Sequence, residues 1–135
     1  MNKEQVIAEL NEILSLEYTA VLQYTYQSIV INGLQRLELL PLFQAEASES
    51  LGHAKLIGDK IVALGGIPTA EVHPINTTTD TRRMLENDLE METRAANLYA
   101  QVLDHAEDDT ALRVMLENQV ETETNSVEEF KRLLA

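Results

Sequence analysis

The chain contains no cysteine and no tryptophan, and only 3 of its 135 residues are proline and 5 are glycine. Without cysteine it has no disulfide bond, no thiolate metal site, no iron–sulfur cluster and no cysteine nucleophile. Imidazole and carboxylate groups therefore remain as the side chains that could bind a metal ion.

Basic residues are also scarce, since 10 of them face 23 acidic residues and the net charge is −13. The average field of such a chain repels phosphate backbones and anionic lipid surfaces, so we expect neither nucleic acid nor a membrane as a partner. The charge also concentrates cations, but it equally keeps copies of a protein apart, and either role explains it.

Long apolar runs are missing as well. Residues 1–12 are charged and amphipathic, unlike a signal peptide, and no stretch has the length needed to span a bilayer, so we expect a cytoplasmic protein. A length of 135 residues with 44% apolar residues suits a single domain over residues 1–135.

Four segments show the apolar periodicity of helices. The first opens at Asn2 and runs to the Asn32-Gly33 stop, and the second begins near Glu38 or Pro41 and ends at the Gly65-Gly66-Ile67-Pro68 breaker. The third is capped near Thr79 or Asp80, and a Glu107-Asp108-Asp109 turn precedes the fourth.

The connections predict how these helices pack. Two of them are short, whereas the aperiodic segment from Pro68 to about Thr79 is long enough to cross the length of a bundle. The predicted fold is all-α: a four-helix bundle of two antiparallel helix pairs joined by a long crossover loop.

One polar residue interrupts the inner, apolar stripe of each helix, near its midpoint: Glu17, His53, Glu92 and Glu123. Antiparallel packing brings these midpoints to one level. Burying unpartnered carboxylates costs several kcal/mol, so their meeting indicates either a bound cation or a tight hydrogen-bond network.

The residues around these positions resemble the ferritin superfamily, in particular bacterioferritins, and more weakly the rubrerythrin bundle. Leu10-Asn11 followed by Glu17 and Gln23-Tyr24 is similar to the bacterioferritin opening, and His53-Ala54 followed by Gly66-Ile67-Pro68 has the spacing of the second helix. Asp88-Leu89 with Glu92, and Glu123 with Val127 and Phe130, resemble the third and fourth ligand segments.

The resemblance implies a di-iron site built from two glutamates and two Glu-x-x-His pairs. This chain departs from that pattern twice, because Ser50 stands where the family has a glutamate and Ser126 where it has a histidine. By resemblance, Glu17, His53 and Glu123 remain as ligands of one metal position. The other position retains only Glu92, together with Glu123, which both positions share.

Two carboxylates and one imidazole suit a single divalent ion such as iron, with manganese or zinc as alternatives. Glu46 and Glu49 precede His53 by seven and four residues and lie near the same helix face, so either could supply a carboxylate to the second position. The resemblance further implies that Tyr24 acts beside the metal, as a source of an electron or a hydrogen bond. It implies no haem, because Leu51 replaces the axial methionine.

Two functions of different class fit the sequence. The first is a bacterioferritin-like protein of iron homeostasis that binds Fe(II) and, if its centre is active, oxidises it as a ferroxidase or a peroxide-reducing oxidoreductase. The alternative is a metal-free bundle with a structural or interaction role, in which protonated glutamates bond to Ser50, Ser126, Tyr24 and Tyr99. The resemblance implies a short fifth helix in cage-forming bacterioferritins, and no such segment follows the fourth helix here, so we expect a homodimer or small oligomer. Leu34, Leu37, Leu39 and Leu40 are expected to be exposed, and they either form the contact between subunits or cap the bundle.

Overall fold

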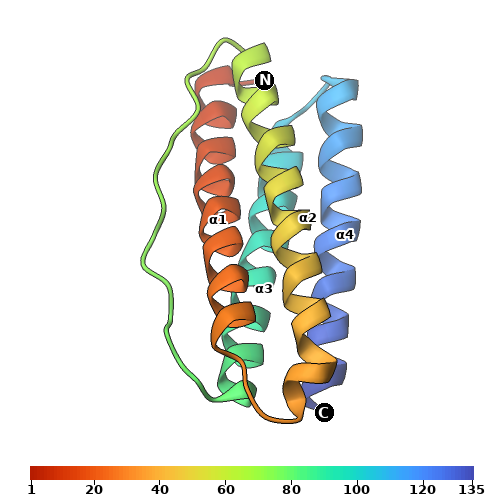
Figure 1. Ribbon diagram of the computed structural model, residues 1–135. Helices are drawn as coiled ribbons and strands as arrows, with labels where there is room; N and C mark the ends of the chain where they lie inside the picture. The colour runs from red at the N-terminus through yellow and green to blue at the C-terminus, as the bar shows by residue number, and fades with distance from the viewer.

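The computed structural model describes all 135 residues, and its elements are four α-helices without any strand. They are α1 (Lys3–Val30), α2 (Gln35–Ala63), α3 (Thr81–His105) and α4 (Thr110–Leu134). Figure 1 shows a four-helix bundle in which α1 runs antiparallel to α2 and α3 runs antiparallel to α4. The fold class and the pairing predicted from the sequence are confirmed.

Polar caps begin two of the helices where the sequence predicts a start. The side chain of Asn2 accepts a hydrogen bond from the backbone N–H of Gln5, and that of Asp109 accepts one from Leu112, both at 3.1 Å. Gly33 follows the end of α1 with φ +74°, a left-handed conformation that costs glycine little.

The predicted start of α2 near Glu38 or Pro41 is wrong, because the helix already begins at Gln35. Pro41 lies inside it, where the missing N–H removes one helical hydrogen bond. A tight first turn, with the N–H of Arg36 donating to Gly33 and that of Leu37 donating to Leu34, extends the helix upstream of the proline. The proline therefore does not set the boundary.

The crossover segment, residues 64–80, joins the two pairs and runs beside α1 along the bundle (Figure 1). Three side chains of α1 spaced four residues apart hold it in place, namely Asn11, Ser15 and Thr19. Asn11 bonds to Ile67 and Thr69, Ser15 donates to the carbonyl of Glu71, and Thr19 accepts from the N–H of His73. This polar stripe determines the path of the long connection.

Close backbone packing joins α1 to α2, α3 to α4 and α1 to α3, whereas α2 and α4 face each other at greater separation. The core consists of aliphatic side chains with a few aromatic rings, of which Tyr24, Tyr99, Phe43 and Phe130 are the largest buried ones. No helix of the protein has the length and apolar character needed to cross a membrane.

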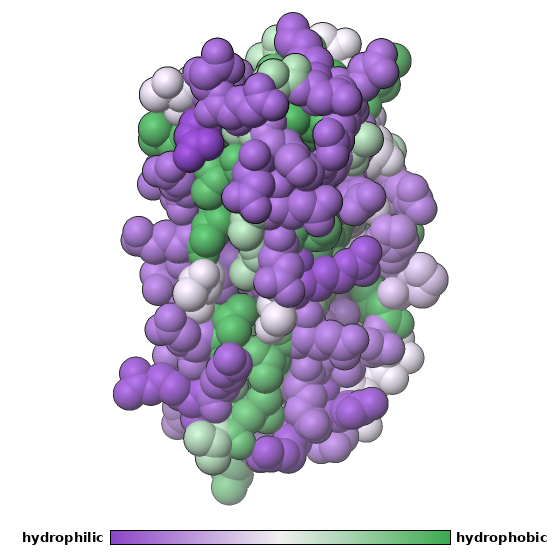
Figure 2. Space-filling model, turned by 180° about the vertical axis from the view of Figure 1, so that it is seen from behind, coloured by the Kyte–Doolittle hydropathy of each residue, from purple (hydrophilic) through white to green (hydrophobic).

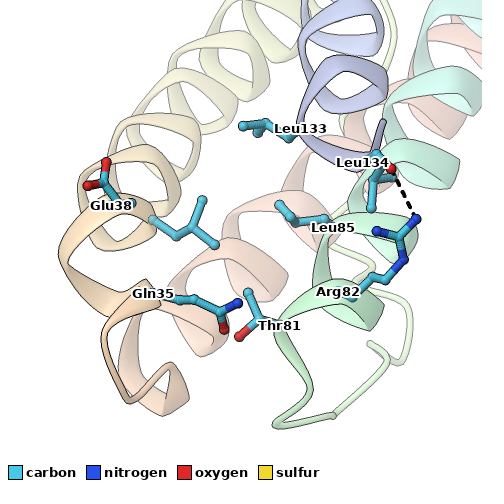
Figure 3. Close-up of a pocket in the computed structure, with 8 residues that line it drawn as sticks. Gln35, Glu38, Thr81, Arg82, Leu85, Leu133 and Leu134 are labelled. Atoms are coloured by element: carbon cyan, nitrogen blue, oxygen red, sulfur yellow. Dashed lines mark hydrogen bonds between the residues drawn. The ribbon is translucent and has the colours of Figure 1, made fainter.

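The four leucines predicted to form a subunit contact differ in exposure. Leu34 and Leu37 are 86% and 77% exposed, whereas Leu39 and Leu40 are half-buried, so the prediction that all four are exposed is wrong. Leu39 instead lines a pocket of about 280 Å³ at the end of the bundle where α3 begins and α4 ends. Figure 3 shows this pocket, with Arg82 donating a 3.0 Å hydrogen bond to the carbonyl of Leu134.

The face of the molecule seen in Figure 2, opposite to that of Figure 1, is largely hydrophilic and carries one narrow hydrophobic strip.

Candidate metal centre

Three ligand-type side chains meet in the middle of the bundle: Glu17 from α1, His53 from α2 and Glu123 from α4. Each offers one atom, and these atoms all lie within 4.8 Å of one another. The two glutamates are buried, at 3% and 2% exposure, and His53 is half-buried. The structure thus brings together three of the four residues that the sequence placed at the bundle midpoint.

The imidazole of His53 directs Nδ1 toward both carboxylates. Nδ1 lies 3.5 Å from Oε2 of Glu17 and 3.3 Å from Oε1 of Glu123, although neither contact has the alignment of a hydrogen bond. Burial alone lowers the pKa of His53, but Glu123 and Glu17 outweigh it and raise this pKa to about 10. Without a metal ion, the protonated imidazole is therefore the positive charge of the centre.

Glu92 of α3 lies next to this group but is not part of it. Its Oε1 accepts a 2.6 Å hydrogen bond from the hydroxyl of Tyr24. Burial, and then the neighbouring Glu123, raise the pKa of Glu92 well above its usual range, while burial also raises the pKa of Glu123. The raised pKa of Glu92 favours its protonated form, whereas His53 opposes the rise in the pKa of Glu123.

Two tyrosine hydroxyls contact buried glutamates: that of Tyr24 contacts Glu92, and that of Tyr99 contacts Glu17. Tyr24 stacks on Phe43 and Phe130, with ring centroids 6.5 and 6.3 Å away, and this packing fixes the direction of its hydroxyl. Tyr99 donates a 3.1 Å hydrogen bond to Oε1 of Glu17 and accepts a 3.3 Å hydrogen bond from Gln119. Tyr24 thus donates its hydrogen bond to Glu92, and its action beside a metal stays a prediction.

The two carboxylates proposed from the sequence as substitutes lie on the outer side of the centre. Oε1 of Glu49 lies 3.7 Å from Nε2 of His53, on the opposite side of the ring from Nδ1. Glu46 is half-buried, and burial followed by the charge of Glu92 raises its pKa to about 8. Neither belongs to the group formed by Glu17, His53 and Glu123.

The hydrogen-bond network of the metal-free alternative is present only in part. The tyrosine hydroxyls of Tyr24 and Tyr99 donate to Glu92 and Glu17. Ser50 and Ser126 make no side-chain hydrogen bond to any of the glutamates, so the predicted serine contacts are wrong. Two of the four predicted partners are therefore in place, one on Glu92 and one on Glu17.

The donor set fits a divalent cation. Nδ1 of His53 and Oε2 of Glu123 are buried without a hydrogen-bond partner, and buried polar atoms rarely remain so. A cation placed among the three groups would give Nδ1 of His53 a partner, with one oxygen of Glu17 and one oxygen of Glu123 as further ligands. Iron, manganese and zinc all accept this set of donors.

A second polar group lies between α1 and α3 and was not predicted as a unit. Oδ1 of Asp88 accepts hydrogen bonds from Gln23 and Gln27, at 2.9 and 2.8 Å. Gln23 and Gln27 continue the four-residue spacing of Asn11, Ser15 and Thr19 on α1. That spacing is the signal in the sequence from which a polar face on α1 could have been predicted.

Antiparallel helices with inward-facing carboxylates and an imidazole from separate helices define the class of carboxylate-bridged bundle proteins. The Ferritin family, described as the ferritin-like domain, matches residues 7–135. The chain belongs to this ferritin-like family, as the resemblance to bacterioferritins predicted.

A similar solved structure is that of ferritin-like, diiron-carboxylate proteins from Bacillus anthracis str. Ames, which is 35% identical to this chain. The match covers 98% of this chain and 97% of that one, with a TM-score of 0.96. The two folds are therefore alike over nearly their entire length.

Two curated relatives match by sequence. A bacterial ferritin from Paramagnetospirillum magnetotacticum is 33% identical over 78% of this chain, and a nutrient stress-induced DNA-binding protein from Nostoc sp. is 28% identical over 73%. The matched parts span 65% and 59% of those relatives, less than two-thirds of their length.

Proposed function

We propose that the protein binds one iron ion per chain at Glu17, His53 and Glu123 and serves in iron homeostasis. The observation that carries this proposal is the approach of three ligand atoms, from three helices, to within 4.8 Å of one another. Two of these residues each leave a buried atom without a partner. The family of the chain and its bacterial ferritin relative support iron over manganese or zinc.

Each residue at this centre would have a distinct role. Glu17 and Glu123 supply negative charge, and His53 supplies a nitrogen once its proton has left. Tyr24 holds Glu92 in place from the adjoining level, at 2.6 Å. Iron, when bound, supplies a centre that can change its oxidation state.

We propose that the second metal position is weak or empty, since Ser50 and Ser126 carry no strong ligand atom. Glu92 alone remains there with a share of Glu123, and Glu49 faces the other ring nitrogen of His53. Rapid two-electron oxidation needs both metals of a di-iron centre, so we expect slow oxidation of Fe(II) by oxygen. Rapid oxidation of two iron ions per chain in stopped flow would contradict this.

The test is metal analysis after anaerobic loading with Fe(II), followed by desalting. We expect about one iron per chain in the natural protein and a loss of binding in His53→Ala. His73→Ala is the matched control, because His73 is an exposed histidine of the crossover segment and should leave binding unchanged. Equal iron content in His53→Ala and His73→Ala would refute the assignment.

About two iron ions per chain would show that another carboxylate completes the second position. Glu49→Gln identifies it: a return to one ion assigns Glu49, and unchanged content excludes it. Glu46→Gln is the parallel variant, since Glu46 is the half-buried carboxylate of that side, whereas Glu49 is exposed.

The second candidate function is a metal-free bundle that acts as an interaction protein. The observation that favours it is the satisfaction of Glu92 and Glu17 by two tyrosine hydroxyls, without any ion. Absence of bound iron, manganese and zinc at every loading would support this alternative over the first.

We further propose that the protein associates into a dimer or small oligomer through Leu34 and Leu37, the most exposed leucines of the α2 start. The Nostoc relative is named as a DNA-binding protein. We do not propose DNA binding for this chain, because its net charge of −13 opposes it. Sedimentation of the natural protein and of Leu34→Ser tests the oligomer: we expect a smaller species for the variant, and a cage-sized particle would refute the proposal.

A further inference from the structure

Asp88 is the most deeply buried acid of the chain, with 0% of its surface exposed. It projects from α3 into the α1–α3 contact, outside the group of Glu17, His53 and Glu123. Its Oδ1 accepts two hydrogen bonds from the amides of Gln23 and Gln27. Its Oδ2 has no hydrogen-bond partner at all.

A second orphaned acceptor belongs to the same cluster. Gln27 donates from Nε2 to Asp88, and its Oε1 is buried without a partner. An unpartnered buried acceptor is destabilising, and this cluster contains two, Oδ2 of Asp88 and Oε1 of Gln27. A proton on Oδ2 of Asp88 removes the buried charge and turns that atom into a donor, for which Oε1 of Gln27 is a free acceptor.

No cation is bonded to Asp88, although Arg94, Glu90 and His73 line a groove beside Gln23, one of the two glutamines that bond to it. The titratable groups that act with it are Tyr24 of α1, Glu46 of α2 and Glu92 of its own helix, and α4 contributes the apolar ring of Phe130 on Tyr24. Burial is the main reason that the pKa of Asp88 rises to about 7, although the two amides oppose it and Glu92 adds to it. Asp88 can therefore gain and lose its proton near neutral pH.

A polar groove on the surface ends at Gln23, which separates it from Asp88. It has a volume of about 150 Å³ and lies between α1, α3 and the crossover segment. Gln23 lines the groove and also donates to Asp88, and Asn87 lines it beside Asp88 in the sequence. The crossover segment is held over the groove by the hydrogen bond between His73 and Thr19.

We propose that Asp88 is a proton-exchange residue, which takes up a proton from water in this groove and holds it in the interior beside Tyr24. In uptake, an O–H bond of hydronium in the groove breaks and an O–H bond forms on Oδ2, leaving a neutral water molecule and a neutral acid. Release is the reverse. The role changes the interior charge by one unit, requires no metal ion and does not depend on the proposed iron site.

Infrared spectroscopy of the metal-free protein between pH 5 and pH 9 tests whether Asp88 carries the proton. Asp88→Asn keeps the shape and the acceptor oxygen but cannot bind an acid proton. Glu46 and Glu92 also give a carbonyl band of a protonated carboxyl, so the readout is the difference between the natural protein and Asp88→Asn. We expect a difference band at pH 6 that fades as the pH rises through neutrality, whereas Glu86→Gln, which changes an exposed acid two residues away, should match the natural protein. Equal bands in the natural protein and Asp88→Asn at pH 6 would overturn the proposal.

A rapid change from H2O to D2O tests the route, because deuteration shifts the same band. Gln23→Met removes the amide that joins the groove to Asp88, and we expect exchange to slow by about tenfold or more. Gln119→Met is the matched control, since Gln119 is another buried glutamine that bonds to Tyr99 instead. Equal exchange rates in the natural protein and Gln23→Met would overturn the route through the groove.

Discussion

Replacing Asp88 by asparagine should change how the stability of the metal-free protein depends on pH. The pKa of Asp88 rises from an ordinary value of 3.8 to about 7 in the folded state, mainly through burial. The folded protein therefore holds this proton more tightly than the unfolded chain does. Between the two pKa values, folding takes up a proton, and the free energy of unfolding falls as the pH rises.

The magnitude follows from the size of this shift. A rise of about three pH units corresponds to roughly 4 kcal/mol, of which roughly 3 kcal/mol is lost between pH 5 and pH 8. Asp88→Asn has no proton to lose, so its stability relative to the natural protein should increase by roughly 3 kcal/mol over that range. The other buried acids are present in both proteins, and their contributions cancel in the difference.

Urea denaturation of the two metal-free proteins at pH 5 and pH 8 measures this difference. The variant should match the natural protein closely at pH 5, because an amide can replace both hydrogen-bonding roles of a protonated acid. Glu86→Gln, at an exposed position of the same helix, should show a difference that does not change with pH. If the gap between Asp88→Asn and the natural protein is equal at both pH values, then Asp88 is ionised throughout and the reasoning fails.

Three further substitutions test the packing by thermal or urea denaturation. Asn11→Ala removes two hydrogen bonds to the crossover segment, at 3.1 and 2.8 Å, and should cost about 1–3 kcal/mol; an unchanged stability would show that the segment is held without them. Gly66→Ala places a Cβ 2.7 Å from Cγ2 of Ile7 and should lower the free energy of unfolding by about 1–3 kcal/mol. An unchanged stability would mean that the Ile7 side chain moves freely. Gly52→Ala meets no atom within 4 Å in the interior of α2 and should stabilise by about 0.5–1 kcal/mol, whereas a loss would indicate a contact at that face.

The helices could be predicted because their signals are local. The cap of Asn2 on Gln5 and that of Asp109 on Leu112 involve residues three apart, and both are present. The start of α2 could not be read in the same way. A proline removes one hydrogen bond and crowds the preceding turn, but this penalty is local and packing of the helix against the core, as by Leu39 and Leu42, outweighs it, so the helix begins at Gln35.

The composition of the candidate centre could also be predicted, but not the partners within it. Helical spacing places Glu17, His53 and Glu123 on inner faces, and bundle geometry brings them to one level. Nδ1 of His53, rather than Nε2, faces the carboxylates, and this depends on how the imidazole ring is rotated. No pattern of residue types records such a rotation.

The amino-acid sequence by itself determined four amphipathic helices, their antiparallel pairing and a carboxylate and imidazole at the midpoint of the bundle. These depend on periodicity, turn residues and connection length, which act between near neighbours in the chain. The tertiary structure alone decided that Glu92 pairs with Tyr24 and that Asp88 lies unexposed between two glutamines of α1. Contacts between residues more than 60 positions apart depend on how whole helices are placed and how deeply each side chain is buried, and those quantities arise only when the four helices pack.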